Sequence, residues 1–362
     1  MTHPTRSRAR NTRTKKSPST DSAARDSMVS RIGQWIRAVL AERPNLSLPG
    51  DYIEPGVRRR WLGYFLPAGF IFFWVLVFYV GFNWQTVGLD ARIYYEGSAA
   101  WLSGKDPWAT GALLNGRLFS YAGLPPTVVL LAPLALLPEE AVVWLLLPLS
   151  VLAAVGVVRA LRMPPIWIAY PPLLAGVLSA NPHVLVLALV VAAGTWGNAL
   201  AAVLKIVVIP PLIGERRWLA LLVAGVVFGA TVVALPGLWS SFLNQAGRVQ
   251  DTISTESGGT FSAWGKPLPF IATVLSLCVL ARLDFRAAAW LVVPALFPTS
   301  QYYYAMFALP VDPFLAAAMA FPVPLMAPLA AIGYTAVRVG IVTWRRSGRA
   351  SPHRPEALGN SE

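Results

Sequence analysis

Long apolar runs without charge follow one another along most of this chain, and they constrain its fold more than any other feature. The first, Leu62 to Phe82, has no charged residue over 21 positions, enough for a helix to cross a bilayer. Further apolar segments lie at 124–138, 141–158, 164–180, 183–196, 198–213, 218–238, 267–281 and 287–299, with two or three more within 302–343.

The composition supports a membrane protein. With 56% hydrophobic and 13% charged residues, the chain is too apolar for an ordinary soluble enzyme, and the same values exclude a disordered protein or a disulfide scaffold. The pattern predicts an all-α polytopic membrane protein of about 10 to 12 spans. Several of these helices should be short, tilted or broken, because prolines interrupt the runs.

The net charge of +13 is concentrated near the two ends. Residues 1–60 hold 13 basic against five acidic residues, and residues 338–362 hold five against two. Basic ends are typical of the cytoplasmic side of a membrane protein and of contact with anionic lipids. We therefore expect membrane lipids as partners and no nucleic acid.

Composition and spacing divide the chain into four parts. Residues 1–27 are polar and basic, which predicts a disordered cytoplasmic tail. Apolar residues at helical spacing after Met28 predict an amphipathic interfacial helix, with a linker, over 28–60. Residues 61–344 form the predicted transmembrane domain, and 345–362 a second basic cytoplasmic tail.

The basic residues also predict sidedness. The positive-inside rule keeps Arg58–Arg60 in the cytoplasm, so residues 83–122 should lie outside. Alternation then puts 239–264 outside and, on the inner side, Glu139–Glu140, Glu215–Arg217 and Arg282–Arg286. Arg159 and Arg162 depart from the rule, because the same alternation leaves them outside.

The first external loop carries the densest set of ionisable and aromatic side chains in the apolar part of the chain. Asp90 follows the first run closely, so its carboxylate should lie near the outer surface, where it can act as a general base on a hydroxyl group. The alternative is that Asp90 only caps a helix. Tyr94, Tyr95 and Trp108 offer flat faces on which a sugar can stack.

Three blocks of this sequence, in order, resemble glycosyltransferase family 87. The first is Asp90-x-x-x-Tyr94-Tyr95 followed by Leu102-x-Gly104-x-Asp106-Pro107-Trp108. The second is Phe119-Ser120-Tyr121 with Leu124-Pro125-Pro126, and the third is Asn181-Pro182-His183 followed by an apolar stretch that contains Lys205. The resemblance covers roughly residues 60–310. It departs from the family at Gln301–Tyr304, where tyrosines stand in place of a histidine that members often carry.

The resemblance implies a GT-C fold and a function. Such a membrane enzyme takes a sugar, mannose first and arabinofuranose next, from a polyprenyl-phosphate donor. The acceptor is a glycolipid or polysaccharide of the cell envelope on the outer face. By position, Asp90 would be the catalytic base that inverts the anomeric centre.

The remaining candidates follow from that chemistry. The leaving phosphate needs positive charge, which the candidates Arg92, Lys105, Lys205 and Arg248 could supply; for Lys205, snorkelling to the interface is an equal alternative. The candidate substrate contacts are Tyr94, Tyr95, Glu96, Trp108, Tyr121, His183, Gln301 and Tyr303. For His183 a structural role, and for the late tyrosines an interfacial aromatic belt, stay open.

No spacing of metal ligands is present in the sequence, so no metal and no cofactor is expected. Two other classes of function stay open. A transporter or flippase for a lipid-linked glycan should carry charges within several spans, whereas a non-catalytic envelope-assembly protein would not depend on Asp90.

Overall fold

The computed structural model describes residues 69, 72–73, 86–114, 117–256, 261–298 and 300–349. The chain divides into the units Met1–Asn45 and Leu46–Glu362, and all described residues belong to the second. The expected tail over 1–27, the expected interfacial helix over 28–60 and nearly all of the first apolar run lie outside them. The expected C-terminal tail over 345–362 is described only to Arg349.

The described residues are almost entirely helical, which confirms the predicted all-α class for that part of the chain. Within it, one small hairpin pairs β1 (Gly111–Leu114) with β2 (Arg117–Ser120) in antiparallel register. The α-helices are α3 (Leu89–Leu102), α4 (Pro125–Leu131), α5 (Glu139–Ala160), α6 (Pro171–Leu178), α7 (Pro182–Ala192), α8 (Thr195–Leu204), α9 (Ile209–Gly214), α10 (Trp218–Ala234), α11 (Pro236–Glu256), α12 (Pro267–Leu283), α13 (Phe285–Leu296), α14 (Pro313–Ala318) and α15 (Met326–Arg349). Short 3₁₀ helices η3 (Pro107–Ala109), η4 (Ala132–Leu136), η5 (Pro165–Ala169), η6 (Ile206–Val208) and η7 (Tyr302–Ala308) connect them.

Proline explains where many of these helices begin. Proline is the first residue of α4, α6, α7, α11, α12 and α14, a position where its missing N–H is unneeded and its fixed φ suits the helix. Frequent restarts keep the middle of the chain in short pieces. Helices α6, α7, α8 and α9 have 8, 11, 10 and 6 residues, so each is only about 9 to 17 Å long.

Two described helices are long and apolar enough to cross a membrane. They are α5, with 22 residues, and the Met326–Thr343 part of α15. The pair formed by α10 and the Pro236–Arg248 part of α11 passes the same test together but is bent by 102°. The other predicted apolar segments within the described residues form shorter helices, several of them broken by a proline or by Lys205.

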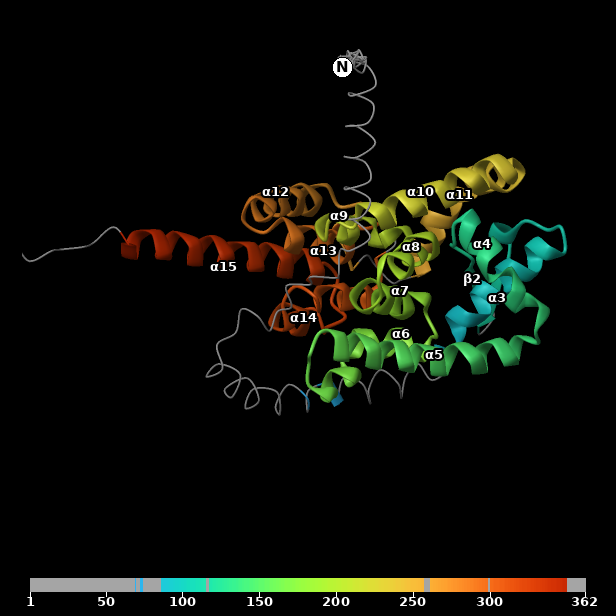
Figure 1. Ribbon diagram of the computed structural model, residues 1–362, viewed down its shortest axis with the longest axis horizontal. Coiled ribbons are helices and arrows are strands. Elements are labelled where there is room, and N and C mark those ends of the chain that lie inside the picture. Colours follow the sequence, from blue (N-terminus) through green and yellow to red (C-terminus); the bar gives the residue numbers. More distant parts are fainter. Residues whose placement is uncertain are drawn as a thin grey trace, which may run out of the picture. The chain divides into compact units, whose positions relative to one another are not determined.

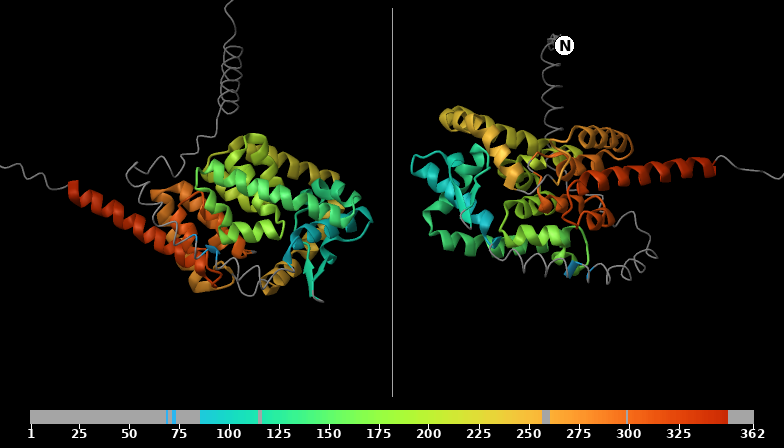
Figure 2. Two further views of the ribbon diagram at one scale, coloured as in Figure 1. Left: turned by 90° about the horizontal axis from the view of Figure 1, so that it is seen from below. Right: turned by 180° about the vertical axis from the view of Figure 1, so that it is seen from behind.

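Helices α5, α7, α8 and α10 pack in that order, and α9, α13, α12 and α15 continue the packing, with the end of α15 extending beyond its neighbours (Figures 1 and 2). The largest core cluster lies among these helices and includes Trp167, Tyr170, Leu187, Trp290 and Phe307, each at most 2% exposed. The Tyr170 hydroxyl donates to the Ala316 carbonyl at 2.7 Å. Distant segments are thereby joined in one core.

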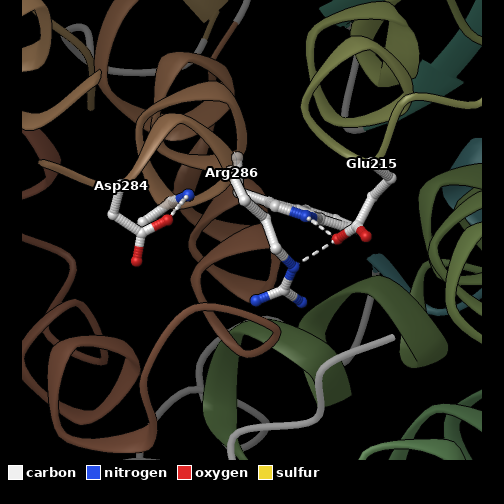
Figure 3. A network of polar contacts seen from close by, with 5 residues as sticks. Glu215, Asp284 and Arg286 are labelled. Atoms are coloured by element: carbon white, nitrogen blue, oxygen red, sulfur yellow. Dashed lines mark hydrogen bonds and ion pairs between the residues drawn. The ribbon is translucent and has the colours of Figure 1, made fainter. Parts of the chain in front are cut away.

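A polar corner joins α9 to α13 (Figure 3). The Glu215 carboxylate accepts hydrogen bonds from Arg286 Nε at 2.6 Å and from Trp290 Nε1 at 2.9 Å. Asp284 begins α13 by accepting from the Ala287 N–H and also pairs with Arg338 of α15 at 3.1 Å. The predicted inner segments around Glu215 and Arg286 therefore do lie together.

The expected crossing over 124–138 is different in the structure. Helices α4 and η4 together have 12 residues, about 20 Å of helix, and η4 packs on α3. Arg92 Nε lies 3.2 Å from Glu139 Oε1. Glu139 therefore lies beside α3, whereas the alternation of spans predicted the two on opposite sides. The prolines at 133 and 138 keep this run in short pieces.

Candidate active site

Backbone hydrogen bonds anchor the beginning of α3. Gly88 N donates to the Leu178 carbonyl at 2.8 Å, and Asp90 N donates to the Ser179 carbonyl at 2.9 Å. Gly88 has φ 71°, and a Cβ there would lie 2.6 Å from Val143 Cγ1, so glycine suits this position on both counts. The first turn of α3 is thereby fixed against the end of α6, and it carries Asp90.

The Asp90 carboxylate meets the side-chain amide of Asn181. Asn181 Nδ2 donates to Asp90 Oδ2 at 2.9 Å. The other end of the same amide begins α7, because Asn181 Oδ1 accepts from the His183 backbone N–H at 2.9 Å. Asn181 and His183 are each 1% exposed, whereas Asp90 is half-buried. The carboxylate is therefore held by a side chain that is itself fixed by the beginning of α7.

His183 closes the buried side of this group. Its Nδ1 contacts Asn181 Oδ1, and its ring packs against the rings of Tyr303 at 5.3 Å and Tyr304 at 4.5 Å between centroids. His183 Nε2 is buried without a hydrogen-bond partner among the described residues. Residues from α3, α7 and η7 thus converge at one place.

Lys205 brings positive charge to the same place. It stands in extended conformation in the break between α8 and η6, where Thr127 of α4 donates its hydroxyl to the terminal α8 carbonyls of Val203 and Leu204. Lys205 Nζ lies 4.9 Å from the centroid of the Tyr94 ring, a cation–π arrangement. Its charge also acts on the Asp90 carboxyl.

Opposing effects set the acidity of Asp90. Burial raises its pKa above the usual aspartate value, while hydrogen bonds from Ser179 and Asn181 and the Lys205 charge lower it, with burial dominant. Glu96, in the last half of α3, also has a raised pKa, from burial and then from Glu139. A raised carboxyl pKa moves a base toward the range in which proton transfer is efficient.

Tyr94 begins a row of aromatic side chains that pack against one another. The Tyr94 and Tyr121 rings meet edge to face at 5.5 Å, Tyr121 lies 6.3 Å from Trp108, and Trp108 lies 5.3 Å from Phe242 of α11. Trp108 Nε1 donates to the Gly123 carbonyl at 2.8 Å. Trp108 and Tyr121 are at most 1% exposed. Both side chains are therefore buried, as Tyr94 is at 5% exposed, and their contact with substrate stays a prediction.

The other candidate cations lie elsewhere. Arg92 pairs with Glu139, Lys105 is exposed, and Arg248 Nη2 donates to the Trp108 carbonyl at 3.2 Å. Among the four predicted phosphate-binding residues, the structure therefore brings Lys205 to Asp90 and gives the other three different surroundings.

The predicted substrate contacts also separate into two groups. Tyr94, His183 and Tyr303 gather around Asp90 and Asn181. Tyr95, Glu96 and Gln301 are half-buried. The backbone carbonyl of Gln301 accepts a hydrogen bond from Tyr304 N at the beginning of η7.

Two further residues belong to the site. In the sequence analysis Asn181 appears only as part of a block. An Asn directly before a Pro is nevertheless a signal for the start of a helix, in which the Asn side chain bonds to the backbone. Ser179 carries no sequence signal. Among the described residues no group of three His, Cys, Asp or Glu side chains could hold a metal.

Comparison with family models, with curated proteins and with solved structures gives no match.

Proposed function

We propose that this chain is an integral-membrane glycosyltransferase that moves a sugar from a polyprenyl-phosphate donor to a glycolipid or polysaccharide acceptor. The observation that carries the proposal is the group formed by the half-buried Asp90, the Lys205 side chain whose charge acts on the Asp90 carboxyl, and the half-buried Tyr303 beside them. Transfer from a phosphate donor needs these groups: a base for the hydroxyl, a charge for the phosphate and flat surfaces for the sugar.

In the proposed step one bond forms and one breaks at the anomeric carbon, and one proton moves to Asp90. The acceptor hydroxyl gives its proton to the Asp90 carboxylate as its oxygen bonds to the anomeric carbon. The bond from that carbon to the phosphate oxygen breaks on the opposite face, with inversion, and the electron pair leaves on polyprenyl phosphate. The Lys205 ammonium stabilises this developing negative charge. No cofactor enters this step.

The distribution of basic residues supports an orientation with Asp90 outside. Glu139 lies beside Arg92 of α3, and α5 runs from Glu139 to Ala160 with Arg159 in its last turn. With α5 as a span, Arg159 and Arg162 lie across the membrane from Asp90, which agrees with the positive-inside rule. The proposed architecture is a GT-C-like helical bundle; within the described residues two helices, or three with the bent α10–α11 pair, are long and apolar enough to be its spans.

The test uses membranes that contain the full chain. They are incubated with labelled polyprenyl-phosphate mannose and, separately, with labelled polyprenyl-phosphate arabinofuranose, and the label is followed into lipid and polymer. Asp90→Asn should lower transfer by about 10² to 10⁴. Glu140→Gln is the matched control, because Glu140 is an exposed carboxylate at the Asp90 end of α5.

Three outcomes decide the proposal. Transfer that depends on Asp90 but not on Glu140 supports it. Absence of label in any product with either donor contradicts it. Movement of a lipid-linked glycan across the membrane without transfer would support the transporter instead.

A further inference from the structure

We propose that Asn181 is a positioning residue: its amide, locked by the beginning of α7, holds the Asp90 carboxylate in the orientation in which it accepts a proton. This inference rests on the proposed function. It concerns a residue that touches Asp90 and not the sugar or phosphate.

The first step is that the Asn181 amide has one possible orientation. Its Oδ1 accepts from the His183 backbone N–H at 2.9 Å. A backbone N–H can only donate, so exchanging the amide oxygen and nitrogen would bring two donors together. Because Asn181 is 1% exposed, water cannot compensate. Nδ2 must therefore face Asp90.

The second step follows for the carboxylate. Asn181 Nδ2 offers a proton to Asp90 Oδ2 at 2.9 Å, so Oδ2 must act as an acceptor. This bond favours the ionised carboxylate, and it works against the burial that raises the pKa of Asp90. A base must be ionised before it can take a proton, so the amide supports the state that the reaction needs.

The third step extends the chain of hydrogen bonds to His183. Asn181 Oδ1 carries no hydrogen, so His183 Nδ1 must carry the proton in the contact between them. That leaves Nε2 as a bare acceptor, and it is buried without a partner among the described residues. A buried polar atom without a partner is costly, and the hydrogen-bond contact that the structure shows for this ring is the one with Asn181. Hydrogen bonds in such a chain polarise one another in the same direction.

The fourth step is the backbone that carries Asn181. Ala180 lies in the left-handed region with φ 54°, where a residue with a Cβ is strained. This strained turn places the Ser179 carbonyl on the Asp90 N–H and the Asn181 amide on the Asp90 side chain. Strain is retained where surrounding structure uses the conformation. The turn Ser179–Asn181 therefore holds both the backbone N–H and the side-chain carboxylate of Asp90.

The test measures transfer against pH in two variants. The titratable groups that face Asp90 are Lys205 from the end of α8, Tyr94 from α3 and Tyr303 from η7, with His183 behind Asn181. Asn181→Ser can still begin α7 but is too short to reach Asp90. Asn181→Asp can also begin α7 but places a second carboxylate beside the first.

Both variants remove a bond to the ionised form, so the acidic limb of kcat/KM should move to higher pH. The shift should be about one pH unit or more in Asn181→Asp, because adjacent carboxylates resist ionising together, and smaller in Asn181→Ser. The control is Asp312→Ala, which removes the side-chain cap of α14. It should leave the limb in place, which separates a positioning role from general loss of a helix cap.

A second measurement does not depend on transfer. Carbodiimide modification of Asp90, followed by mass spectrometry of its peptide across pH, reports the protonation of the carboxyl itself. Its midpoint should rise in both variants. If it rises while the unmodified chain transfers no sugar, the positioning stands and the proposed function fails. If transfer occurs and neither the limb nor the midpoint moves in folded variants, the positioning role of Asn181 is overturned.

Discussion

Two ion pairs near the beginning of α13 differ mainly in burial, and they make a sharp prediction about stability. Figure 3 shows the first of them, between Glu215 and Arg286. The side chains of Glu215 and Arg286 are 7% and 20% exposed, whereas those of Asp284 and Arg338 are 30% and 41% exposed. Glu215 also accepts from Trp290 Nε1 at 2.9 Å. Removing Glu215 therefore leaves two buried donors, and removing Arg338 leaves none.

The magnitudes follow from this difference. Breaking a buried pair by deleting one partner costs about 3 to 5 kcal/mol, and because Arg286 retains some exposure we expect Glu215→Ala to cost about 3 kcal/mol. Arg338→Gln should cost at most about 1 kcal/mol, as for exposed pairs. Glu215→Gln should fall between them, since its amide oxygen still accepts. The double change Glu215→Leu with Arg286→Met should recover most of the loss, because no charge is left buried.

The assay is unfolding in detergent micelles by stepwise addition of SDS, followed by tryptophan fluorescence. The midpoints of the four variants are compared with that of the unchanged chain at one pH and ionic strength. Repeating the series at high salt should reduce the Arg338 effect further, because exposed pairs are screened. Equal midpoints for Glu215→Ala and Arg338→Gln would refute the argument from burial.

Three further predictions concern single positions. Burial raises the folded-state pKa of Asp90, so its ionisation opposes folding as the pH rises through that pKa. Asp90→Asn should therefore raise the thermal unfolding midpoint at neutral pH, and the difference should disappear in acid. A lowered midpoint at neutral pH would contradict this. Arg216 is exposed and has φ 56°, so Arg216→Gly should stabilise the fold by about 1 kcal/mol. Arg216→Ala keeps the Cβ and should not stabilise it. Equal unfolding midpoints for the two variants would count against backbone strain. Trp108→Phe leaves the Gly123 carbonyl without the indole N–H that bonds to it at 2.8 Å, and it should destabilise the fold by about 1 to 3 kcal/mol. The control Trp196→Phe changes a residue that is 72% exposed and should have little effect on the unfolding midpoint.

The apolar runs predicted the helical class and several elements closely. The run over 141–158 falls within α5, and the Asn-Pro-His block begins α7 at the proline. Apolar content alone could not show that 124–138 turns back, because a short proline-broken run and a crossing have the same composition. The alternation that separated Glu139 from Asp90 rested on that ambiguity.

Once the bounds of α3 are known, the helical spacing predicts which of its residues share the face of Asp90. Tyr94 stands four residues after Asp90 and shares its face, whereas Arg92, two residues after it, points to the other side, where it meets Glu139. No local pattern predicts the partnership of Asp90 with Asn181, which lies 91 positions away. Such pairs depend on how helices pack, and the preference of Lys205 over Arg248 near Asp90 has the same origin.

That separation of 91 positions also orders events during synthesis. At about 5 to 20 residues per second, Asp90 is incorporated about 5 to 20 seconds before Asn181, and Tyr303 follows later still. Throughout that interval the carboxylate has no amide to hold it, and the first turn of α3 lacks the Leu178 and Ser179 carbonyls that anchor it. A nascent chain that stalls before residue 181 therefore carries the whole first loop without the turn that organises it, and quality-control proteases would meet that loop in an unprotected form.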